Sequence, residues 1–354
     1  MKQTRTLQIR VKDKHSKLLD QLASEVNFVW NYCNELSYRA WRSRQQWLTG
    51  YDVQKYTKGA SKELKLDSTC IQCISEEHAR RRKQFKRSKL RWRVSKGSRR
   101  SLGWIPFKKG AAQWVNGQVR YAGFAFSVWD SYGLSDYPFR AGSFSQDARG
   151  RWYFNVAVQV EKPQTQAQTA VGIDLGLKDV ATTSDGEQLK NQRIYRSHEK
   201  ALADAQRAGK KGRVRAIHAK IRNTRKDAQH KFSTELVKNH AAIFVGNIKS
   251  KPLTQTKMAK SVLDAGWHQL KTMLAYKCDS AGVVFKAIDE KYTTQTCSAC
   301  GSLPRSRPKG IAGLGIREWT CGECGVHHDR DINAARNILA LGHQRLDGGI
   351  PFLH

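Results

Sequence analysis

Acidic residues are scarce in this sequence compared with basic ones. Its 354 residues include 30 Asp and Glu against 63 Lys and Arg, which gives a formal net charge of +33. Repulsion among so many like charges opposes compaction, so the excess serves binding rather than folding. The usual partner of such a chain is a polyanion, and nucleic acid is the commonest one.

Long hydrophobic runs are absent as well. No apolar stretch approaches the ~18 residues that a membrane-spanning helix needs, so we expect no membrane partner. The N-terminal stretch MKQTRTLQIRVKDK lacks the apolar segment of a secretory signal. We therefore expect a cytoplasmic protein, in which the eight cysteines do not form a disulfide framework.

Hydrophobic periodicity divides the first half of the chain into segments of different character. Residues 4–11 alternate between polar and apolar, as in a half-exposed strand, and residues 14–42 carry apolar side chains at helical spacing. Residues 69–93 are predicted to continue as a strongly basic helix. Short runs rich in Gly, Val and aromatic residues over 104–160 predict a β-rich module, and 162–170 reads as a linker.

From residue 171 onwards, predicted strands and helices alternate, which indicates an α/β domain. The predicted strands cover 171–183, 189–195, 241–248 and 282–290. One or two long basic helices are expected over 198–240, and a further helix over 258–277.

Two Cys-x-x-Cys pairs near the C-terminus predict a metal site. They are Cys297 with Cys300, and Cys321 with Cys324. Two such pairs complete a tetrahedron of thiolates around one Zn²⁺ ion, and the closed coordination indicates a structural role. Cys70 and Cys73 share the spacing, but no second pair lies nearby, so they are interpreted as small residues on one helix face.

Two aspartates stand at informative places. Asp174 follows the apolar run Val171-Gly172-Ile173, and Asp331 begins the helix-like run DINAARNIL. An aspartate at the start of a helix is commonly an N-cap, and Asp331 taken alone would be interpreted that way. Asp329, two residues earlier, is a second candidate for either role.

The combination of motifs is more specific than any single acid. The stretches GIDLGLKDVATTSDG, YTTQTCSACGS and REWTCGECGVHHDRDINAARNIL resemble the TnpB family, RNA-guided nucleases of insertion sequences related to compact type V CRISPR effectors. The resemblance spans residues 171–340. The N-terminal half is compatible with the family but carries less specific motifs.

The resemblance implies an α/β multi-domain fold, in which an RNase H-like RuvC nuclease core carries an inserted zinc ribbon. It adds an N-terminal β-rich wedge module and a helical recognition lobe. The implied divisions are 1–13 (first wedge strand), 14–103 (recognition lobe), 104–168 (wedge module and linker), 169–294 (RuvC-like core), 295–326 (zinc ribbon), 327–342 (C-terminal helix of the core) and 343–354 (tail).

The resemblance also implies DNA cleavage with two Mg²⁺ ions, which carboxylates hold through hard oxygen ligands. Asp174 matches the first metal ligand. Asp331 matches the ligand on the C-terminal helix, and we prefer it to Asp329 because it directly precedes the small residues that would pack on a sheet.

The family's third carboxylate, a glutamate, is missing from its usual place. The strand AIFVGNI offers only Gly246 and Asn247 there, so either the nuclease is inactive or another acid replaces the glutamate. In an RNase H-like sheet the strands of Asp174, AIFVGNI and VVFKAIDE lie side by side and parallel, so their carboxyl ends share one edge. Of Asp264, Asp289 and Glu290, we predict that Glu290 supplies the metal ligand, because it is the longest side chain and lies furthest along its strand end.

Two basic runs are predicted to bind the phosphates of a guide RNA and of double-stranded target DNA without reading sequence. The predicted contacts are Arg80, Arg81, Arg82, Lys83, Lys86, Arg87, Lys89, Arg91, Arg93, Lys210, Lys211, Arg213, Arg215, Lys220, Arg222 and Arg225. Phe85 and Trp92 are interleaved with the first run. Aromatic side chains stack on unpaired bases, but we expect these two to face the core of a helix packing.

The leading hypothesis is therefore an RNA-guided, metal-dependent endonuclease of a transposable element, which cuts double-stranded DNA next to a short adjacent motif. An RNA-guided repressor that binds without cutting is the alternative that Gly246 suggests, whereas intact Asp174 and Asp331 favour cutting. A transposase that joins DNA strands shares the acidic chemistry but fits the motifs less well. A nucleoid-associated, prokaryotic location follows from the leading hypothesis.

Overall fold

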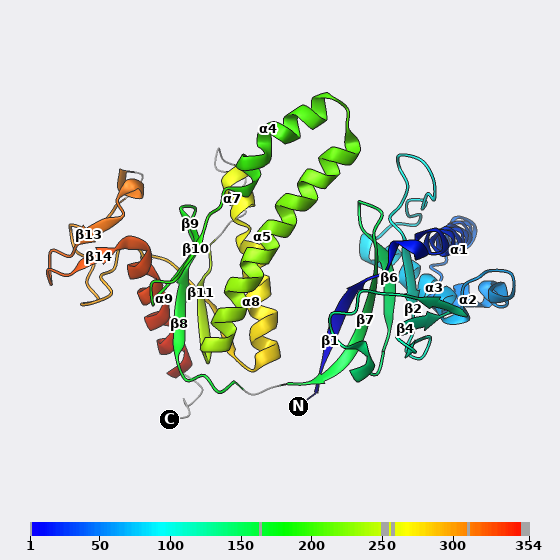
Figure 1. Cartoon of the computed structure of the whole chain (residues 1–354), viewed down its shortest axis with the longest axis horizontal. Coiled ribbons are helices and arrows are strands. Elements are labelled where there is room, and N and C mark those ends of the chain that lie inside the picture. The colour runs from blue at the N-terminus through cyan, green and yellow to red at the C-terminus, as the bar shows by residue number, and fades with distance from the viewer. Residues whose placement is uncertain (1, 163–164, 249–254, 256–258, 310–311, 348–354) are drawn as a thin grey trace. The chain divides into compact units, whose positions relative to one another are not determined.

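The structure is a computed structural model that describes residues 2–162, 165–248, 255, 259–309 and 312–347. The chain divides into two compact units, Met1–Glu161 and Lys162–His354. Both mix helices and strands, so the prediction of an α/β protein is confirmed (Figure 1). In the part of the chain so described, no helix has the length and apolar character needed to cross a membrane.

The first unit contains two antiparallel sheets. The larger one has the order β1-β7-β6-β2, formed by β1 (Lys2–Arg10), β2 (Trp104–Phe107), β6 (Gly142–Gln146) and β7 (Trp152–Glu161). The smaller one joins β3 (Ala112–Val115), β4 (Gln118–Tyr121) and β5 (Phe124–Phe126). Alternate residues of β7, such as Phe154 and Val156, are fully buried, as the two-residue period of a strand requires.

Three helices complete the core of the first unit: α1 (Ser16–Arg44), α2 (Gly50–Thr57) and α3 (Ser68–Phe85). The Asp67 carboxylate accepts the backbone N–H groups of Thr69 and Cys70 and so caps α3. The helix predicted over 69–93 is wrong in its second part. Helix α3 ends at Phe85, and Lys86 turns the chain with a φ of 50°.

An asparagine ladder on α1, made by Asn27, Asn31 and Asn34, holds the segment that follows α3. Asn34 accepts the backbone N–H of Leu90 at 2.9 Å and donates to its carbonyl at 2.8 Å, and Asn31 makes the same pair of bonds with Arg93. Asn27 accepts from the guanidinium of Arg93. These side chains satisfy backbone groups that a continued helix would have paired internally, which explains why the segment leaves the helix.

The second unit is built on one sheet with the order β10-β9-β8-β11-β12. Its strands are β8 (Ala170–Asp174), β9 (Asp179–Thr183), β10 (Gln188–Lys190), β11 (Ala242–Gly246) and β12 (Val284–Ile288). Strands β8, β11 and β12 are adjacent and parallel, which confirms the predicted strand order.

Two predicted strands differ in the structure. The segment 171–183 forms two antiparallel strands, because the chain turns after Asp174 and Thr182 pairs back with Asp174. Of the next predicted strand, 189–195, only 189–190 lies in a strand, β10, and a helix begins at Ile194.

Helices cover both faces of this sheet (Figure 1). They are α5 (Lys211–Asn239), α7 (Ala259–Ala265), α8 (Trp267–Ala281) and α9 (Arg330–Asp347), whereas α4 (Ile194–Arg207) packs on α5. Helices α5, α7 and α8 bury one face, and α9 packs on the other against β8 and β11. The single helix predicted over 258–277 is two helices, because Gly266 adopts a left-handed φ of +67° between them.

A small hairpin of β13 (Glu318–Thr320) and β14 (His327–Asp329) leads directly into α9. Strand β14 pairs with β13 up to Asp329, three residues beyond the expected end of the zinc ribbon at residue 326.

Candidate active site and cysteine cluster

Asp174 lies at the carboxyl end of β8, the central strand of the sheet. The strand is apolar up to this point because β9, β11 and α9 enclose it, and Val171 and Ile173 are fully buried. The side chain of Asp174 shares this environment, with 8% of the residue exposed. A carboxylate at the end of a buried strand is poorly solvated, and its ionisation requires nearby positive charge.

Helix α9 approaches β8 so closely that a glycine is required. A Cβ atom on Gly172 would lie 2.1 Å from the carbonyl oxygen of Ala335. Asp331 lies one helical turn before Ala335, about 6 Å along α9, and Asp174 lies two residues after Gly172, about 6.6 Å along β8. The contact therefore brings the two carboxylates together. Burial is the largest cause of the raised pKa of Asp174, and the charge of Asp331 is the second largest.

Asp329 and Asp331 have different roles at the start of α9. The Asp329 carboxylate accepts the backbone N–H groups of Asp331 and Ile332, both at 2.9 Å, and so acts as the helix cap. Asp329, and not Asp331, is therefore the N-cap of α9. Asp331 is left with its carboxylate beside Asp174.

The carboxylate of Glu290 lies over Gly246. In the parallel register, Gly246 pairs with Ile288 at the ends of β11 and β12, and Glu290 follows two residues later. A Cβ atom on Gly246 would lie 2.8 Å from Oε2 of Glu290 and 3.6 Å from its Cβ. The glutamate side chain thus fills the space into which a side chain at position 246 would project.

Asp174 is buried at this edge of the sheet, and the half-buried Glu290 and Asp331 both act on its carboxylate. Burial first, and then the Asp331 and Glu290 carboxylates, raise the pKa of Asp174 to about 7. Burial also raises the pKa of Glu290 and of Asp331. The hard oxygen ligands of such a group fit a divalent cation such as Mg²⁺. Within the described ranges, only the four cysteines discussed below bring ligand atoms within 4.8 Å of one another, so the acids are spaced more widely than a single-ion cage.

The two other acids considered for the third position are engaged differently. The Asp264 carboxylate pairs with Arg225 at 2.7 Å and accepts the backbone N–H of Tyr195 at 3.1 Å. Asp289 is exposed and accepts the backbone N–H of Lys291 at 3.2 Å. Glu290 is the candidate whose charge raises the pKa of Asp174.

Two cations beside the acids were missed by sequence reasoning. Nη1 of Arg317 lies 3.5 Å from Oδ1 of Asp331, and the carbonyl of Arg317 accepts the backbone N–H of Arg330 at 2.7 Å. Burial raises the pKa of Asp331, and the charges of Arg317 and Lys178 oppose that rise. No sequence signal separates these two from the other 61 basic residues, because only the fold places them here.

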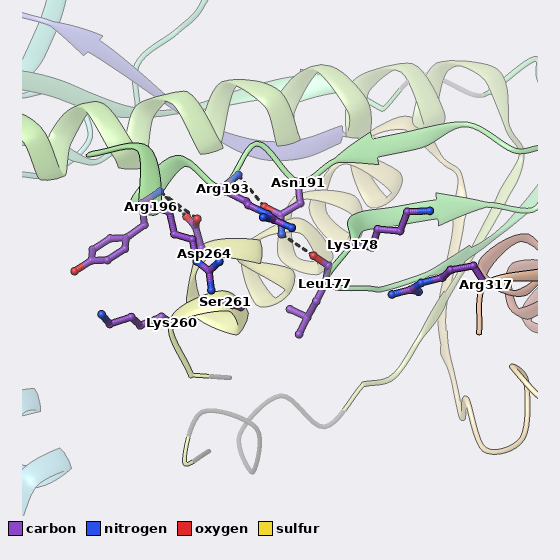
Figure 2. Close-up of a pocket in the computed structure, with 10 residues that line it drawn as sticks. Leu177, Lys178, Asn191, Arg193, Arg196, Lys260, Ser261, Asp264 and Arg317 are labelled. Carbon is purple, nitrogen blue, oxygen red and sulfur yellow. Dashed lines mark hydrogen bonds between the residues drawn. The ribbon is translucent and has the colours of Figure 1, made fainter. Parts of the chain in front are cut away.

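Both cations also line a pocket of about 310 Å³ in the second unit (Figure 2). Arg193 lies just before α4, Arg196 lies on α4, and Lys260 lies at the start of α7; these three residues bring the cations of the lining to five. The only acid in the lining is Asp264, which Arg225 already neutralises. Lys260 pairs with Glu199 at 2.7 Å, but the remaining lining is still positive and suits a phosphate.

The four predicted cysteine ligands converge. The Sγ atoms of Cys297, Cys300, Cys321 and Cys324 all lie within 4.8 Å of one another, which fits a tetrahedral metal site. Sequence reasoning missed a neighbour, His328, which is 3% exposed and places Nε2 3.0 Å from Sγ of Cys297. Its ring stacks at 4.9 Å against Trp319. Cys70 and Cys73 lie on α3 outside this cluster, as interpreted from the sequence.

Asparagines of α9 tie this cluster to the sheet. Asn333 and Asn337 both donate to the carbonyls of Thr293 and Thr296, and Asn333 accepts the backbone N–H of Ser298 at 2.9 Å. Asn333 was expected to allow close packing by its small size, but its main contribution is this clamp on the segment that carries Cys297.

The predicted phosphate contacts fall into two classes. Most are exposed, and the exposed ones are Arg80, Lys83, Lys86, Arg87, Arg91, Lys210, Lys211, Arg213, Arg215, Lys220 and Arg222. Arg82 is wrong as a free contact, because it is 1% exposed and stacks 4.6 Å above the ring of Trp47. Arg93 and Arg225 are held by Asn27 and Asp264.

Two further residues of the first run are also committed to neighbours within the protein. The side chain of Lys89 pairs with Glu35 at 3.0 Å, and Arg81 pairs with Glu77.

Comparison with known proteins matches two families. Residues 153–257 match OrfB_IS605, described as "Probable transposase", and residues 267–338 match "Cas12f1-like, TNB domain". A "Putative RNA-guided DNA endonuclease" of Streptomyces pristinaespiralis is 34% identical over 276 residues, which cover 73% of this chain and 66% of the relative. InsQ of Escherichia coli K12, with the same printed description, is 29% identical over 56% of each chain. "TnpB-like protein L79" of Acanthamoeba polyphaga mimivirus is 26% identical over 56% of this chain and 42% of its own length. The chain belongs to the TnpB family.

The TnpB-family matches include all three acids. The first range contains Asp174 and Gly246, and the second contains Glu290, the four cysteines and Asp331. This TnpB-family chain spans two thirds or less of the three relatives, with shares of 66, 56 and 42% of their lengths. A solved Cas12f1–sgRNA–target DNA complex has a TM-score of 0.59 at 13% identity, over 95% of this chain and 98% of that chain, and so shares its fold.

Proposed function

We propose that this chain is an RNA-guided, metal-dependent endonuclease that cuts double-stranded DNA next to a short adjacent motif. The observation that carries the proposal is the position of Glu290. Its carboxylate fills the space above Gly246 and acts on Asp174, so the acid missing from β11 is replaced from β12. The printed names of two relatives, RNA-guided DNA endonuclease, support the same reaction and partners.

In this proposal the second unit contains a RuvC-like core, in which Asp174, Glu290 and Asp331 would hold Mg²⁺. When bound, a pair of Mg²⁺ ions activates the attacking water and stabilises the leaving oxygen. The acids themselves must be ionised to bind a cation. Burial raises the pKa of all three, and that of Asp174 rises to about 7, so Asp174 is partly protonated near neutral pH. Metal binding therefore releases protons from this site.

The cations near the acids position the DNA strand. Arg317 reaches the Asp331 carboxylate, and it shares the positive pocket with Lys178, Arg193 and Lys260 (Figure 2). Guanidinium and ammonium groups bind successive phosphates of one strand, so the pocket orients the scissile phosphate towards the acids. We assign Arg317 to the reacting phosphate and the remaining cations to its neighbours along the strand.

The cysteine cluster is proposed to hold a structural Zn²⁺ in a zinc ribbon. His328 would donate Nε2–H to the Cys297 thiolate, which fixes the ligand without occupying the metal. The ribbon continues through β14 into α9, and the carbonyl of Arg317 accepts from Arg330 at that junction. Zinc binding therefore stabilises the start of the helix that carries Asp331.

Guide RNA and target DNA would be held by the exposed cations of α3 and α5, without contacts to base edges. The first unit then corresponds to the wedge module and recognition lobe. The tail expected over 343–354 is helical in its first part, because α9 continues to Asp347, and residues 348–354 lie outside the described residues.

The test is cleavage of a matched linear duplex by the protein with its guide RNA in Mg²⁺. Glu290→Gln and Asp174→Asn keep the side-chain size and should each abolish cutting while leaving DNA binding intact. Asp289→Asn is a matched control that should cut, since its carboxylate is exposed and accepts the backbone N–H of Lys291. Binding by the wild type without any cutting would contradict the proposal and favour the RNA-guided repressor that Gly246 suggests.

A further inference from the structure

A second cavity lies in the first unit, between the end of α3 and the chain that follows it. Its volume is about 960 Å³, which is in the ~300–1,000 Å³ range of small-molecule sites. Trp92 and Phe85 are 52% and 55% exposed at its wall, contrary to the expectation that both face the core. Exposed aromatic rings grouped in one hollow indicate a binding surface rather than random exposure.

Some of the arginines that line the hollow are held by neighbours within the protein, and others are not. Arg80 and Arg81 pair with Glu77, and Arg93 is held by Asn27. The side chains of Arg87, Arg91 and Arg99 also line the hollow, and no hydrogen bond or ion pair within the described residues occupies them. The hollow therefore combines exposed aromatic rings with arginine side chains that have no ion pair or hydrogen bond among the described residues.

The wall that carries Trp92 is held in place before any ligand arrives. The asparagine ladder fixes Leu90 and Arg93 on either side of Trp92 through four backbone bonds of 2.8–2.9 Å. On one side of the ring, Nζ of Lys89 lies 5.8 Å from its centroid. A backbone fixed on both sides of Trp92 lowers the conformational entropy that this segment loses when a ligand stacks on the ring.

We propose that this hollow binds unpaired nucleotides, with a base stacked on Trp92 or Phe85 and the adjoining phosphates on Arg87 and Arg91. Bases within a duplex are already stacked on one another, so only an unpaired base offers its face to the rings. The unpaired nucleotides come either from the guide RNA or from an opened DNA strand, which share this chemistry. The inference rests on the proposed function only for its nucleic-acid partner, and it requires no cleavage.

The experiment is a titration of the RNA-free, full-length protein with short oligonucleotides that carry one 2-aminopurine. Single-stranded RNA, single-stranded DNA and the matching duplex form three arms. We expect the fluorescence of the single strands to be quenched on binding, and Trp92→Leu or Phe85→Leu to weaken their binding roughly 10-fold. Trp92→Tyr should retain the quenching. Trp129→Leu is the matched control, because Trp129 is 63% exposed but lies outside the hollow.

The outcomes separate the sources and the hypotheses. Quenching with RNA alone supports the proposal with guide RNA as the occupant, and quenching with both single strands supports it for either source. If Trp92→Leu and Phe85→Leu both bind and quench like the wild type, or if the duplex binds with equal strength and equal sensitivity to them, the proposal is overturned. Thermal melting of the variants shows that they are folded. An inactive nuclease would change none of these results.

Discussion

Replacing Gly246 by alanine tests whether the glycine exists to make room for Glu290. The added Cβ atom would lie 2.8 Å from Oε2 of Glu290, whereas an ordinary contact begins at 3.4 Å, so the carboxylate must retreat by about 0.6 Å. A misplacement of about 1 Å in a catalytic geometry can cost on the order of 100-fold in rate. We therefore expect single-turnover cleavage to fall by about 10-fold.

The same substitution should leave the fold intact. Gly246 is not among the residues with a left-handed φ, so alanine is compatible with its backbone. Its other close neighbour is Cδ1 of Ile338 at 3.2 Å, a side-chain end that can give way. Reduced freedom of the unfolded chain offsets that contact by about 0.4–1 kcal/mol, so the melting temperature should stay near that of the wild type.

Two other glycines serve as controls for this prediction. Gly212→Ala adds a methyl group on α5 with nothing within 4 Å and should cut at the wild-type rate. Gly172→Ala would instead meet backbone atoms of α9 and should lower the melting temperature strongly. Full cleavage by a folded Gly246→Ala variant would refute the assignment of Glu290.

Three further predictions follow from the sites. The pKa of Asp174 is raised to about 7, so the cost of ionising it destabilises the metal-free fold increasingly from about pH 4 to 7. The Asp174→Asn variant should therefore have a higher melting temperature than the wild type at pH 8, with a smaller difference at pH 5. Equal differences at both pH values would count against the raised pKa. Cys324→Ser should lose the one bound zinc measured by atomic absorption, whereas Cys73→Ser should keep it, and retention by both would exclude the four-cysteine site. Arg213→Ala should lower the slope of log K against log salt for RNA binding by about 1. Arg225→Ala should instead lower the melting temperature, because the ion pair with Asp264 is lost. A slope unchanged by Arg213→Ala would show that Arg213 does not contact the RNA phosphates.

The order of the central strands was predictable because their sequences allow few alternatives. Strands β8 and β11 read as continuous apolar runs, as strands covered on both faces do, and parallel strands place their carboxyl ends at one edge. That argument predicts Glu290, rather than Asp264 or Asp289, as the third ligand. The cysteine spacing was equally informative, since two knuckles around one ion leave little geometric choice.

The basic runs were less predictable, because the role of an arginine depends on partners distant in sequence. Arg82 looks like its neighbours in the run, but Trp47, 35 residues earlier, covers its guanidinium. The helix expected beyond Phe85 gives way for a similar reason. Asn31 and Asn34 on α1 form hydrogen bonds with the backbone of Arg93 and Leu90, and these bonds compete with those of a helix. Helix propensity depends on the local sequence and does not include partners on α1.

The exchange between Gly246 and Glu290 depends on geometry rather than on position in the chain. Two neighbouring parallel strands end in register, so a long side chain two residues beyond the end of β12 can reach back over the end of β11. A side chain on β11 at this point would meet it, since even a Cβ atom on Gly246 would lie 2.8 Å from Oε2 of Glu290. The glycine and the glutamate are therefore linked, because any side chain at 246 would displace the Glu290 carboxylate. A sheet edge that needs one carboxylate at one point in space can take it from either strand.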